Sequence, residues 1–268
     1  MRAWLLGILM LTSTTPVQAA DRILALSPHA CEMLYAIGAA AQIAGAVSYC
    51  DYPAAAKQLP RIGSYQGVNV EAALRLQPDA AVVLNRHVKG VEQLSNMGVT
   101  IIVSDPHNME EVFRDIDRLG RLTGHAKQAQ QLVAAQRKRL QQVRRQAAKQ
   151  HVRVFYELWP DPLLTAGGLS FINALITEAG GNNVFAAIPM DTPHVNVESV
   201  IRAKPQVIII PLEKRKMVER RRFWRRWLHK DSVTFAAINP DILHRPGPRL
   251  IDGVEQLQRI FTAAADRK

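Results

Sequence analysis

A segment of 17 residues occurs twice in the chain, 127 positions apart. Val68–Leu84 reads VNVEAALRLQPDAAVVL and Val195–Pro211 reads VNVESVIRAKPQVIIIP. Both copies begin with VNVE, carry an arginine and a proline at matching places, and contain a hydrophobic run near the end. A helix followed by a buried strand is the simplest structure for this pattern. The chain is therefore expected to contain two units of similar build.

Short apolar runs alternate with helical patterns around these repeats. Strands are predicted after Arg22 and at Val47–Ser48, Ala80–Leu84 and Val99–Val103, and a helix is predicted at Met109–Leu122. Strands that alternate with helices indicate a parallel sheet with helices on both faces. We therefore expect an α/β fold.

His125–Gln150 interrupts this alternation. It contains no glycine or proline, is rich in strong helix formers, and has only a narrow apolar stripe. A single helix of about 39 Å is expected here, a rigid strut and not an ordinary core helix. Residues 21–124 and 151–268 are then two similar β/α lobes joined by one long rigid helix, residues 125–150. A ligand cleft is expected between the lobes.

The first 20 residues have the features of a cleaved secretory signal. Arg2 gives a positive start, Ala3–Leu11 is apolar, Pro16 breaks the helix, and small residues precede the cleavage point. A membrane anchor is the alternative, but a spanning helix needs about 20 apolar residues, roughly twice this run. We expect cleavage after Ala19 or Ala20 and export to the periplasm.

The composition, 48% hydrophobic and 21% charged, excludes a disordered or fibrous chain. A formal net charge of +11 suggests a nucleic-acid binder, and Glu219–Lys230 (ERRRFWRRWLHK) mixes arginine with aromatic residues. Export argues against a nucleic-acid partner, and helical spacing places Phe223 and Trp227 on one face of a basic, solvated helix.

We see no nucleophile elbow, phosphate-binding loop or dinucleotide fingerprint, so we do not expect an enzyme.

The two cysteines, Cys31 and Cys50, would reach an oxidising compartment, where a pair tends to form a bridge. Closing a loop of about 20 residues would stabilise the fold by roughly 3 kcal/mol. The alternative is a thiolate metal site with His29. We expect the disulfide.

Five histidines occupy places where ligands bind in α/β folds. His29, His87, His107 and His244 each follow a predicted strand, and His194 precedes the second VNVE. Loops after the carboxyl ends of strands form the ligand crevice of open sheets. A single loop histidine is usually a solvated polar residue. His29 and His194 are nevertheless candidate ligand contacts, because neutral imidazole can coordinate cobalt or haem iron. No dedicated metal site is expected, since the sequence has no His-rich tract.

Motifs spread over nearly the whole mature chain resemble those of a known family. The matching stretches are LSPHACEMLYAIGA (26–39), VSYCDYP (47–53), GSYQGVNVE (63–71), RVFYELWPDP (153–162), EAGGNNVF (178–185), VNVESV (195–200) and PDILHRPGPRL (240–250). The chain resembles the periplasmic binding proteins of ABC importers whose lobes are joined by a single helix, and within them the cobalamin-binding members.

The resemblance implies a protein that captures a corrinoid (cobalamin) and presents it to a permease and ATPase complex. It also implies a monomer that binds its ligand without a cofactor of its own. Haem or a ferric siderophore is the alternative ligand, because relatives carry both.

The resemblance further implies which residues face the ligand. Tyr49 and Tyr65 match pocket aromatics of the cobalamin binders, and Trp159 is a candidate aromatic of the second lobe. Asp241 and Arg245 match polar contacts at the pocket rim. Core packing is the alternative for the aromatic residues, and a local ion pair is the alternative for Asp241 and Arg245.

Two other pocket aromatics of the cobalamin binders fall near Leu84 and Thr192, so half of that aromatic lining is missing here.

Two acidic residues at equivalent places in the repeats, Glu71 and Glu198, match those that relatives offer to arginine pockets on the permease. The alternative is local. After Asn69 or Asn196 as N-cap, each glutamate falls in a first helical turn, where the helix dipole favours a negative charge. Both roles can hold together.

Overall fold

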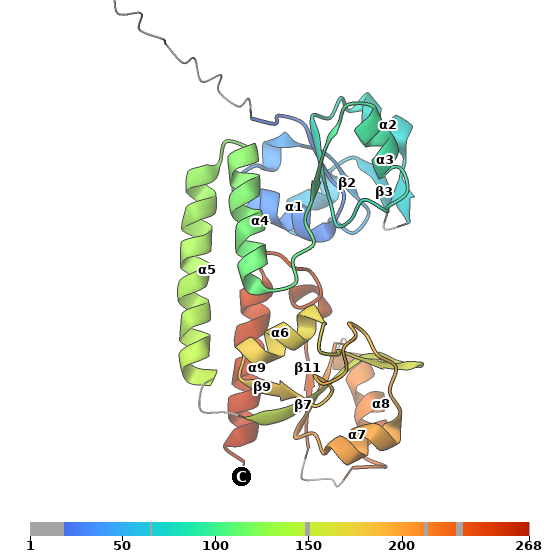
Figure 1. The fold of residues 1–268 in the computed structure, drawn as a ribbon, viewed down its shortest axis with the longest axis vertical. Helices are drawn as coiled ribbons and strands as arrows, with labels where there is room; N and C mark the ends of the chain where they lie inside the picture. Colours follow the sequence, from blue (N-terminus) through green and yellow to red (C-terminus); the bar gives the residue numbers. More distant parts are fainter. Residues whose placement is uncertain (1–18, 65, 148–150, 212–213, 229–232, 268) are drawn as a thin grey trace, which may run out of the picture.

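The computed structural model describes residues 19–64, 66–147, 151–211, 214–228 and 233–267. It has two lobes, each built on a largely parallel sheet, and a layer of helices joins them along one side (Figure 1). This two-lobed α/β architecture confirms the fold predicted from the alternation of strands and helices.

The N-terminal lobe contains a sheet with the strand order β4-β3-β2-β1-β5-β6, in which β3 and β4 pair antiparallel and the other pairs are parallel. Its strands are β1 (Ile23–Ala25), β2 (Ile43–Val47), β3 (Arg61–Ser64), β4 (Gly67–Val68), β5 (Ala80–Val83) and β6 (Thr100–Val103). Its helices are α1 (Pro28–Ala36), α2 (Val70–Arg75), α3 (Val91–Asn96) and α4 (Met109–Leu122), with 3-10 turns at Ala40–Gln42 and Ala54–Gln58.

The C-terminal lobe contains a sheet with the order β11-β10-β7-β8, and β9 also pairs with β7. Its strands are β7 (Val152–Pro160), β8 (Leu163–Thr165), β9 (Gly181–Asn183), β10 (Val207–Ile210) and β11 (Thr234–Ala237). Its helices are α6 (Phe171–Glu178), α7 (Val197–Ala203), α8 (Lys214–Trp224) and α9 (Leu250–Ala265), with a 3-10 turn at Pro240–Ile242.

The duplicated segment folds in the same way in both lobes, as α2 followed by β5 and as α7 followed by β10. The side chains of Asn69 and Asn196 each accept a hydrogen bond from the backbone N–H three residues on, at 3.0 and 2.8 Å. Each helix is followed by a residue in the left-handed region, Gln77 or Lys204, both with φ of 47°. The chain then turns into a strand whose four residues are all buried.

The long helix α5 (Ala126–Ala147) lies within the predicted range, and residues 148–150 lie outside the described residues. Its buried side chains are Ala129, Val133, Gln136, Leu140, Val143 and Ala147. This face packs along α4 of one lobe and α9 of the other (Figure 1). Arg137 of α5 pairs with Glu110 at 2.6 Å, and Arg139 pairs with Glu255 at 2.8 Å. The helix is therefore packed against both lobes, whereas the sequence suggested a strut with little core contact.

Three apolar clusters form the interior. One runs beneath the helical layer and includes buried residues of both lobes, such as Ile23, Phe113 and Val154. The other two lie on the outer faces of the sheets, one under α2 and α3 and one under α7 and α8. Within the described residues, no helix is both long and apolar enough to cross a bilayer.

Candidate functional site

A cavity of about 820 Å³ lies between the two lobes. From the N-terminal lobe it is lined by Leu84, Asp105, Pro106 and His107, which follow the carboxyl ends of β5 and β6. From the C-terminal lobe it is lined by Leu158, Leu169, Ser170, Phe171, Ile172, Asp191, Thr192, Leu243, His244 and Pro246. Loops that follow parallel strands thus build one side of a cleft large enough for a small molecule.

The lining combines apolar walls with a particular set of polar groups. Leucine, isoleucine, proline and phenylalanine side chains form the walls, and Asp105 and Asp191 contribute carboxylates from opposite lobes. Among the described residues that line this cavity there is no lysine or arginine. The cavity therefore offers flat apolar contact, hydrogen-bond acceptors and negative charge.

His244 is a neutral polar group at this cavity. Its Nε2 atom lies 2.8 Å from the hydroxyl oxygen of Tyr156 on β7. Burial lowers the pKa of His244, so the imidazole is neutral at neutral pH, and burial raises the pKa of the Tyr156 hydroxyl. The pair presents a hydrogen-bonded, uncharged group beside the two carboxylates.

Trp159 lines a second cavity, of about 660 Å³, which shares Leu158 and His244 with the first. The Trp159 side chain is 57% exposed, and its Nε1 donates a hydrogen bond to the Asp161 carbonyl at 2.9 Å. The predicted aromatic of the second lobe is thus held at the end of β7, beside the inter-lobe cavity and not in its wall.

Asp241 and Arg245 form the local ion pair that was the alternative for them, with 2.9 Å between Oδ1 and Nη2. Arg245 also reaches the other lobe, where its Nη1 lies 2.6 Å from Oδ1 of Asp51. The hydrogen bond from Arg245 holds the pKa of Asp51 below its usual range. Tyr49, two residues before Asp51, is 50% exposed. The described residues that line the cavity do not include Tyr49, Asp241 or Arg245, although they include His244 and Pro246 on either side of Arg245.

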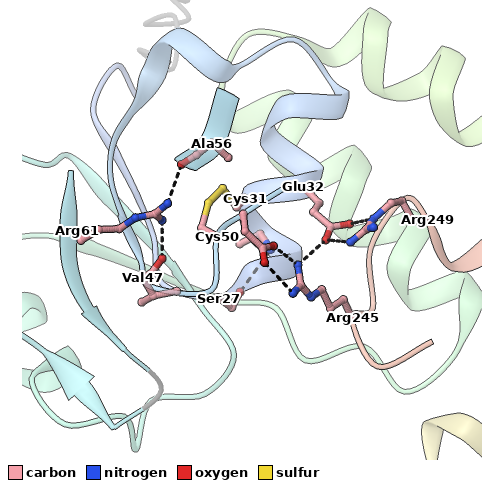
Figure 2. Close-up of a disulfide and its surroundings, with 11 residues drawn as sticks. Ser27, Cys31, Glu32, Val47, Cys50, Ala56, Arg61, Arg245 and Arg249 are labelled. Carbon is pink, nitrogen blue, oxygen red and sulfur yellow. Dashed lines mark hydrogen bonds and ion pairs between the residues drawn. A yellow bond between two sulfur atoms is a disulfide. The ribbon is translucent and has the colours of Figure 1, made fainter. Parts of the chain in front are cut away.

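A second contact between the lobes was not predicted from the sequence. The Glu32 carboxylate on α1 is buried and accepts hydrogen bonds from Arg249 Nε at 2.8 Å and Nη2 at 2.6 Å (Figure 2). Arg245 Nη1 approaches the same carboxylate at 3.3 Å. The two arginines are more than 200 positions away from Glu32 in the sequence, so no local pattern indicates this cluster.

The two histidines predicted as ligand contacts do not line the cavity. His29 is buried in the N-terminal lobe, with Nε2 at 2.9 Å from the Ser104 carbonyl oxygen, and burial lowers its pKa to about 4. His194 is exposed and forms an isolated bridge with Leu164. Strand ends do supply imidazoles to the cavity, but these are His107 and His244. Both were among the five histidines singled out by their places near strands, and those places alone did not separate them from His29 and His194.

The disulfide between Cys31 and Cys50 is confirmed, with 5.9 Å between the Cα atoms (Figure 2). It ties α1 to the loop after β2. Both sulfurs are in the bridge, which leaves neither as a thiolate for the alternative metal site with His29.

Two predicted features lie outside the described residues. Tyr65, a candidate pocket aromatic, is one, and residues 1–18 of the predicted signal peptide are the other.

Glu71 and Glu198 stand in the first turns of α2 and α7, and both are exposed. The two helices belong to different lobes and lie on the side of the molecule away from α4, α5 and α9 (Figure 1). Glu71 forms an ion pair with Arg75 one turn later. The placement, one carboxylate on each lobe, suits both a dipole role and a shared contact surface.

Comparison with known proteins gives a consistent result. Residues 23–220 match the family described as "Periplasmic binding protein". The chain is 33% identical over 247 residues to the vitamin B12-binding protein of Yersinia pestis (strain Pestoides F), which covers 91% of this chain and 87% of that protein.

Solved structures agree in fold. The periplasmic vitamin B12 binding protein of Vibrio cholerae superposes with a TM-score of 0.81 at 31% identity, covering 92% of this chain and 98% of that one. The periplasmic heme binding protein of the same organism superposes with a TM-score of 0.79 at 17% identity, covering 89% of this chain and 98% of that one. The second likeness concerns the fold alone.

Proposed function

We propose that this chain, which belongs to the periplasmic binding protein family, captures a corrinoid of the vitamin B12 type between its lobes and delivers it to an ABC importer. The two relatives described above that exceed 30% identity are named for vitamin B12 binding. The cavity between the lobes is the place where this ligand would sit.

The charge of the cavity lining is the observation that carries the proposal. A corrinoid is a flat macrocycle fringed by amide groups, which donate hydrogen bonds to carboxylates such as Asp105 and Asp191. Haem carries propionates, which would enter a cavity with two carboxylates and no lysine or arginine among its described lining residues. Burying those propionates without a partner is costly. The lining therefore favours the corrinoid over haem.

The shape of the lining supports a broad ligand. Leu84 and Thr192, the positions that match missing aromatics, both face the cavity and leave room where larger rings would stand. We propose that the ligand covers Phe171 and extends past Leu158 toward Trp159, since the two cavities share Leu158 and His244. Tyr49 and Asp241 would then meet its edge, and Arg245 would stand behind Asp241, already paired with Glu32, Asp51 and Asp241.

Absorption titration with cyanocobalamin and with haemin tests the proposal, because the two ligands have distinct visible spectra. We expect saturable corrinoid binding and much weaker haem binding. Phe171→Ala is expected to weaken corrinoid affinity about five-fold or more, because an aromatic contact is worth about 1 kcal/mol. Trp227→Ala removes an exposed aromatic on the outer side of the C-terminal lobe and is the matched control.

Tight haem binding together with no detectable corrinoid binding would move the assignment to haem. Equal loss in Phe171→Ala and Trp227→Ala would place the ligand elsewhere on the protein.

The docking role of Glu71 and Glu198 is part of the same proposal. Both carboxylates are exposed, they occupy equivalent positions of the repeat, and each belongs to a different lobe. A permease that meets both would hold the two lobes at once, with the cavity between them. The chain has a net positive charge, so two exposed carboxylates at equivalent places of the two lobes are distinctive contacts for cationic pockets.

We also propose that the signal peptide is cleaved after Ala19 and not after Ala20. Ala20 is buried, its N–H donates to the Leu122 carbonyl at 2.9 Å, and its carbonyl accepts from Gln42 Nε2 at 2.8 Å. A mature chain that begins at Ala20 keeps these contacts. Mass spectrometry of the exported protein identifies its first residue, and a chain that begins at Asp21 would contradict the proposal.

A further inference from the structure

The positive charge of the chain is concentrated in one short segment. Residues 214–230 contain nine lysines and arginines and one glutamate, a net charge of +8. Removal of the signal peptide would take away only Arg2 and leave the whole mature chain at +10. None of these residues is among the described lining of the inter-lobe cavity, so the segment calls for a separate explanation.

Four of these cations are displayed together at α8 and the turn after it. We define the α8 basic surface as Arg221, Arg222, Arg225 and Arg226 with the adjacent Val218 and Trp227. All four arginines are exposed, and with Val218 they line a concavity of about 440 Å³. No carboxylate of the described residues forms an ion pair with any of the four.

The neighbouring arginine on the same helix behaves differently. Arg220 turns inward and pairs with the buried Glu157, with 2.6 Å between Nε and Oε1. Trp224 is fully buried against the sheet and anchors the helix. The four exposed guanidinium groups are therefore held on a fixed scaffold, and binding a partner would not require the helix to form.

Two apolar side chains stand among these cations. Val218 is 62% exposed and Trp227 is 54% exposed. Phe223 and Trp224 pack toward the core, whereas Trp227, which the helical spacing placed on the same face as Phe223, is left in solvent. An exposed tryptophan beside a cluster of arginines is the combination that binds the interface of an anionic bilayer, where the ring enters the headgroup layer and the cations meet phosphates.

We infer that the α8 basic surface binds anionic phospholipid headgroups of the membrane that holds the permease. The charge is complementary, and α8 covers the same face of the C-terminal sheet as α7, which carries Glu198. Both helices lie away from α4, α5 and α9 (Figure 1). If Glu198 docks on the permease, the α8 basic surface faces the bilayer around it. Only this orientation rests on the proposed delivery function; lipid binding itself does not.

Vesicle co-sedimentation of the purified mature protein tests the inference. We expect binding to phosphatidylglycerol-containing vesicles and little binding to pure phosphatidylcholine. Each cation near an anionic surface changes partitioning by about five-fold, so the variant Arg221→Gln/Arg222→Gln/Arg225→Gln/Arg226→Gln should lose about 100-fold or more. The variant Trp227→Ala should bind these vesicles about five-fold more weakly than the wild type. Corrinoid titration of each variant shows that it is folded and reports on the proposed function independently.

The matched control removes the same charge from the opposite side of the molecule. Its four substitutions fall on exposed residues of α4, α5 and α9: Arg121→Gln, Lys138→Gln, Arg145→Gln and Arg259→Gln. We expect this variant to keep most of the vesicle binding.

Three results would overturn the inference. One is an equal loss in the control variant, which would mean that net charge alone attracts the vesicles. Another is equal binding to phosphatidylcholine, or no binding to either vesicle. The third is stronger binding to duplex DNA at physiological salt, lost in the same α8 variant, which would assign the surface to nucleic acid.

Discussion

The two copies of the repeat agree up to the end of the strand and differ in the helix that follows. In both, an asparagine caps a short helix and a left-handed residue leads into a fully buried strand. After β5 comes α3, six residues long, which buries Val91 and Leu94 and carries a single charged residue, Glu92. After β10 comes α8, eleven residues long, which buries Trp224 and displays arginines.

This difference separates what the repeat supplies from what each lobe adds. The shared helix and strand build the outer face of each sheet and place one exposed glutamate on it. The segment after the strand is free to vary, because its backbone leaves the buried sheet. In the N-terminal lobe it leads to Leu84 in the cavity, and in the C-terminal lobe it leads to a basic surface.

The largest effect is expected where the two copies are equivalent. Reversing both charges, Glu71→Arg with Glu198→Arg, should abolish transport and complex formation with the permease and leave corrinoid affinity nearly unchanged. Like charges across an interface cost several kcal/mol, whereas neither carboxylate lines the cavity. Uptake is measured in cells that lack the wild-type protein, and affinity by titration.

The single reversals sharpen this comparison. If the lobes contribute equally, Glu71→Arg and Glu198→Arg impair uptake to a similar extent. Normal uptake by the double variant would leave only a dipole role, for which a stability loss of about 0.3–1 kcal/mol per site is expected.

The next effect concerns the buried ion pair between Arg220 of α8 and Glu157 of β7 in the C-terminal lobe. Arg220→Ala should lower the free energy of unfolding by about 3–5 kcal/mol, because it leaves the Glu157 carboxylate buried with no cationic partner. Denaturant unfolding measures this. Arg221→Ala, one residue away and exposed, should change stability by about 0.5 kcal/mol or less. Similar values for the two variants would show that the buried pair is not held as described.

A buried histidine at the start of α1 should make the N-terminal lobe sensitive to acid. His29 has a pKa of about 4 in the fold against an ordinary value of 6.5, so the unfolded chain binds more protons between these pH values. Stability should therefore fall as pH drops from 6.5 toward 4, by about 3 kcal/mol from this group.

The variant His29→Gln isolates this contribution, since glutamine can donate to the Ser104 carbonyl and does not titrate. The difference in unfolding free energy between wild type and His29→Gln should shrink as pH falls. A constant difference across this pH range would contradict the prediction. Half-buried Asp115, whose pKa burial raises, is present in both proteins.

The smallest effect tests whether the caps are interchangeable. Asn69→Ala and Asn196→Ala should each cost about 1 kcal/mol, because each removes one side-chain acceptor from a helix N-terminus. The sites lie in different lobes, so the double variant should show the sum in equilibrium unfolding. A much larger cost at one site would mean that the two copies are not equivalent.

The fold could be predicted from the sequence more fully than the residues that line the ligand cavity. Repeats, strand alternation and the helix at 125–150 are local patterns, and they led correctly to two lobes and a cleft. The disulfide followed from export and from there being only two cysteines. The cavity lining depends on loops of two lobes meeting in space, so no local sequence pattern marked Phe171 and Asp191 as lining residues. His29 was interpreted as a loop residue, although it lies in α1 and its side chain is buried in the core. The pairing of Arg245 with Asp51 spans 194 positions, beyond any periodicity.

The Glu32 carboxylate, held by Arg245 and Arg249 from the other lobe, has a mechanical consequence. Any motion that draws the lobes apart at this joint breaks the ion pairs of Glu32 with Arg245 and Arg249. The lobes are therefore joined twice, by α5, which packs along both of them, and by this cluster of ion pairs. Both connections resist opening of the cleft. A ligand then enters a shape that already exists, and the force that parts the lobes for release must come from the transporter.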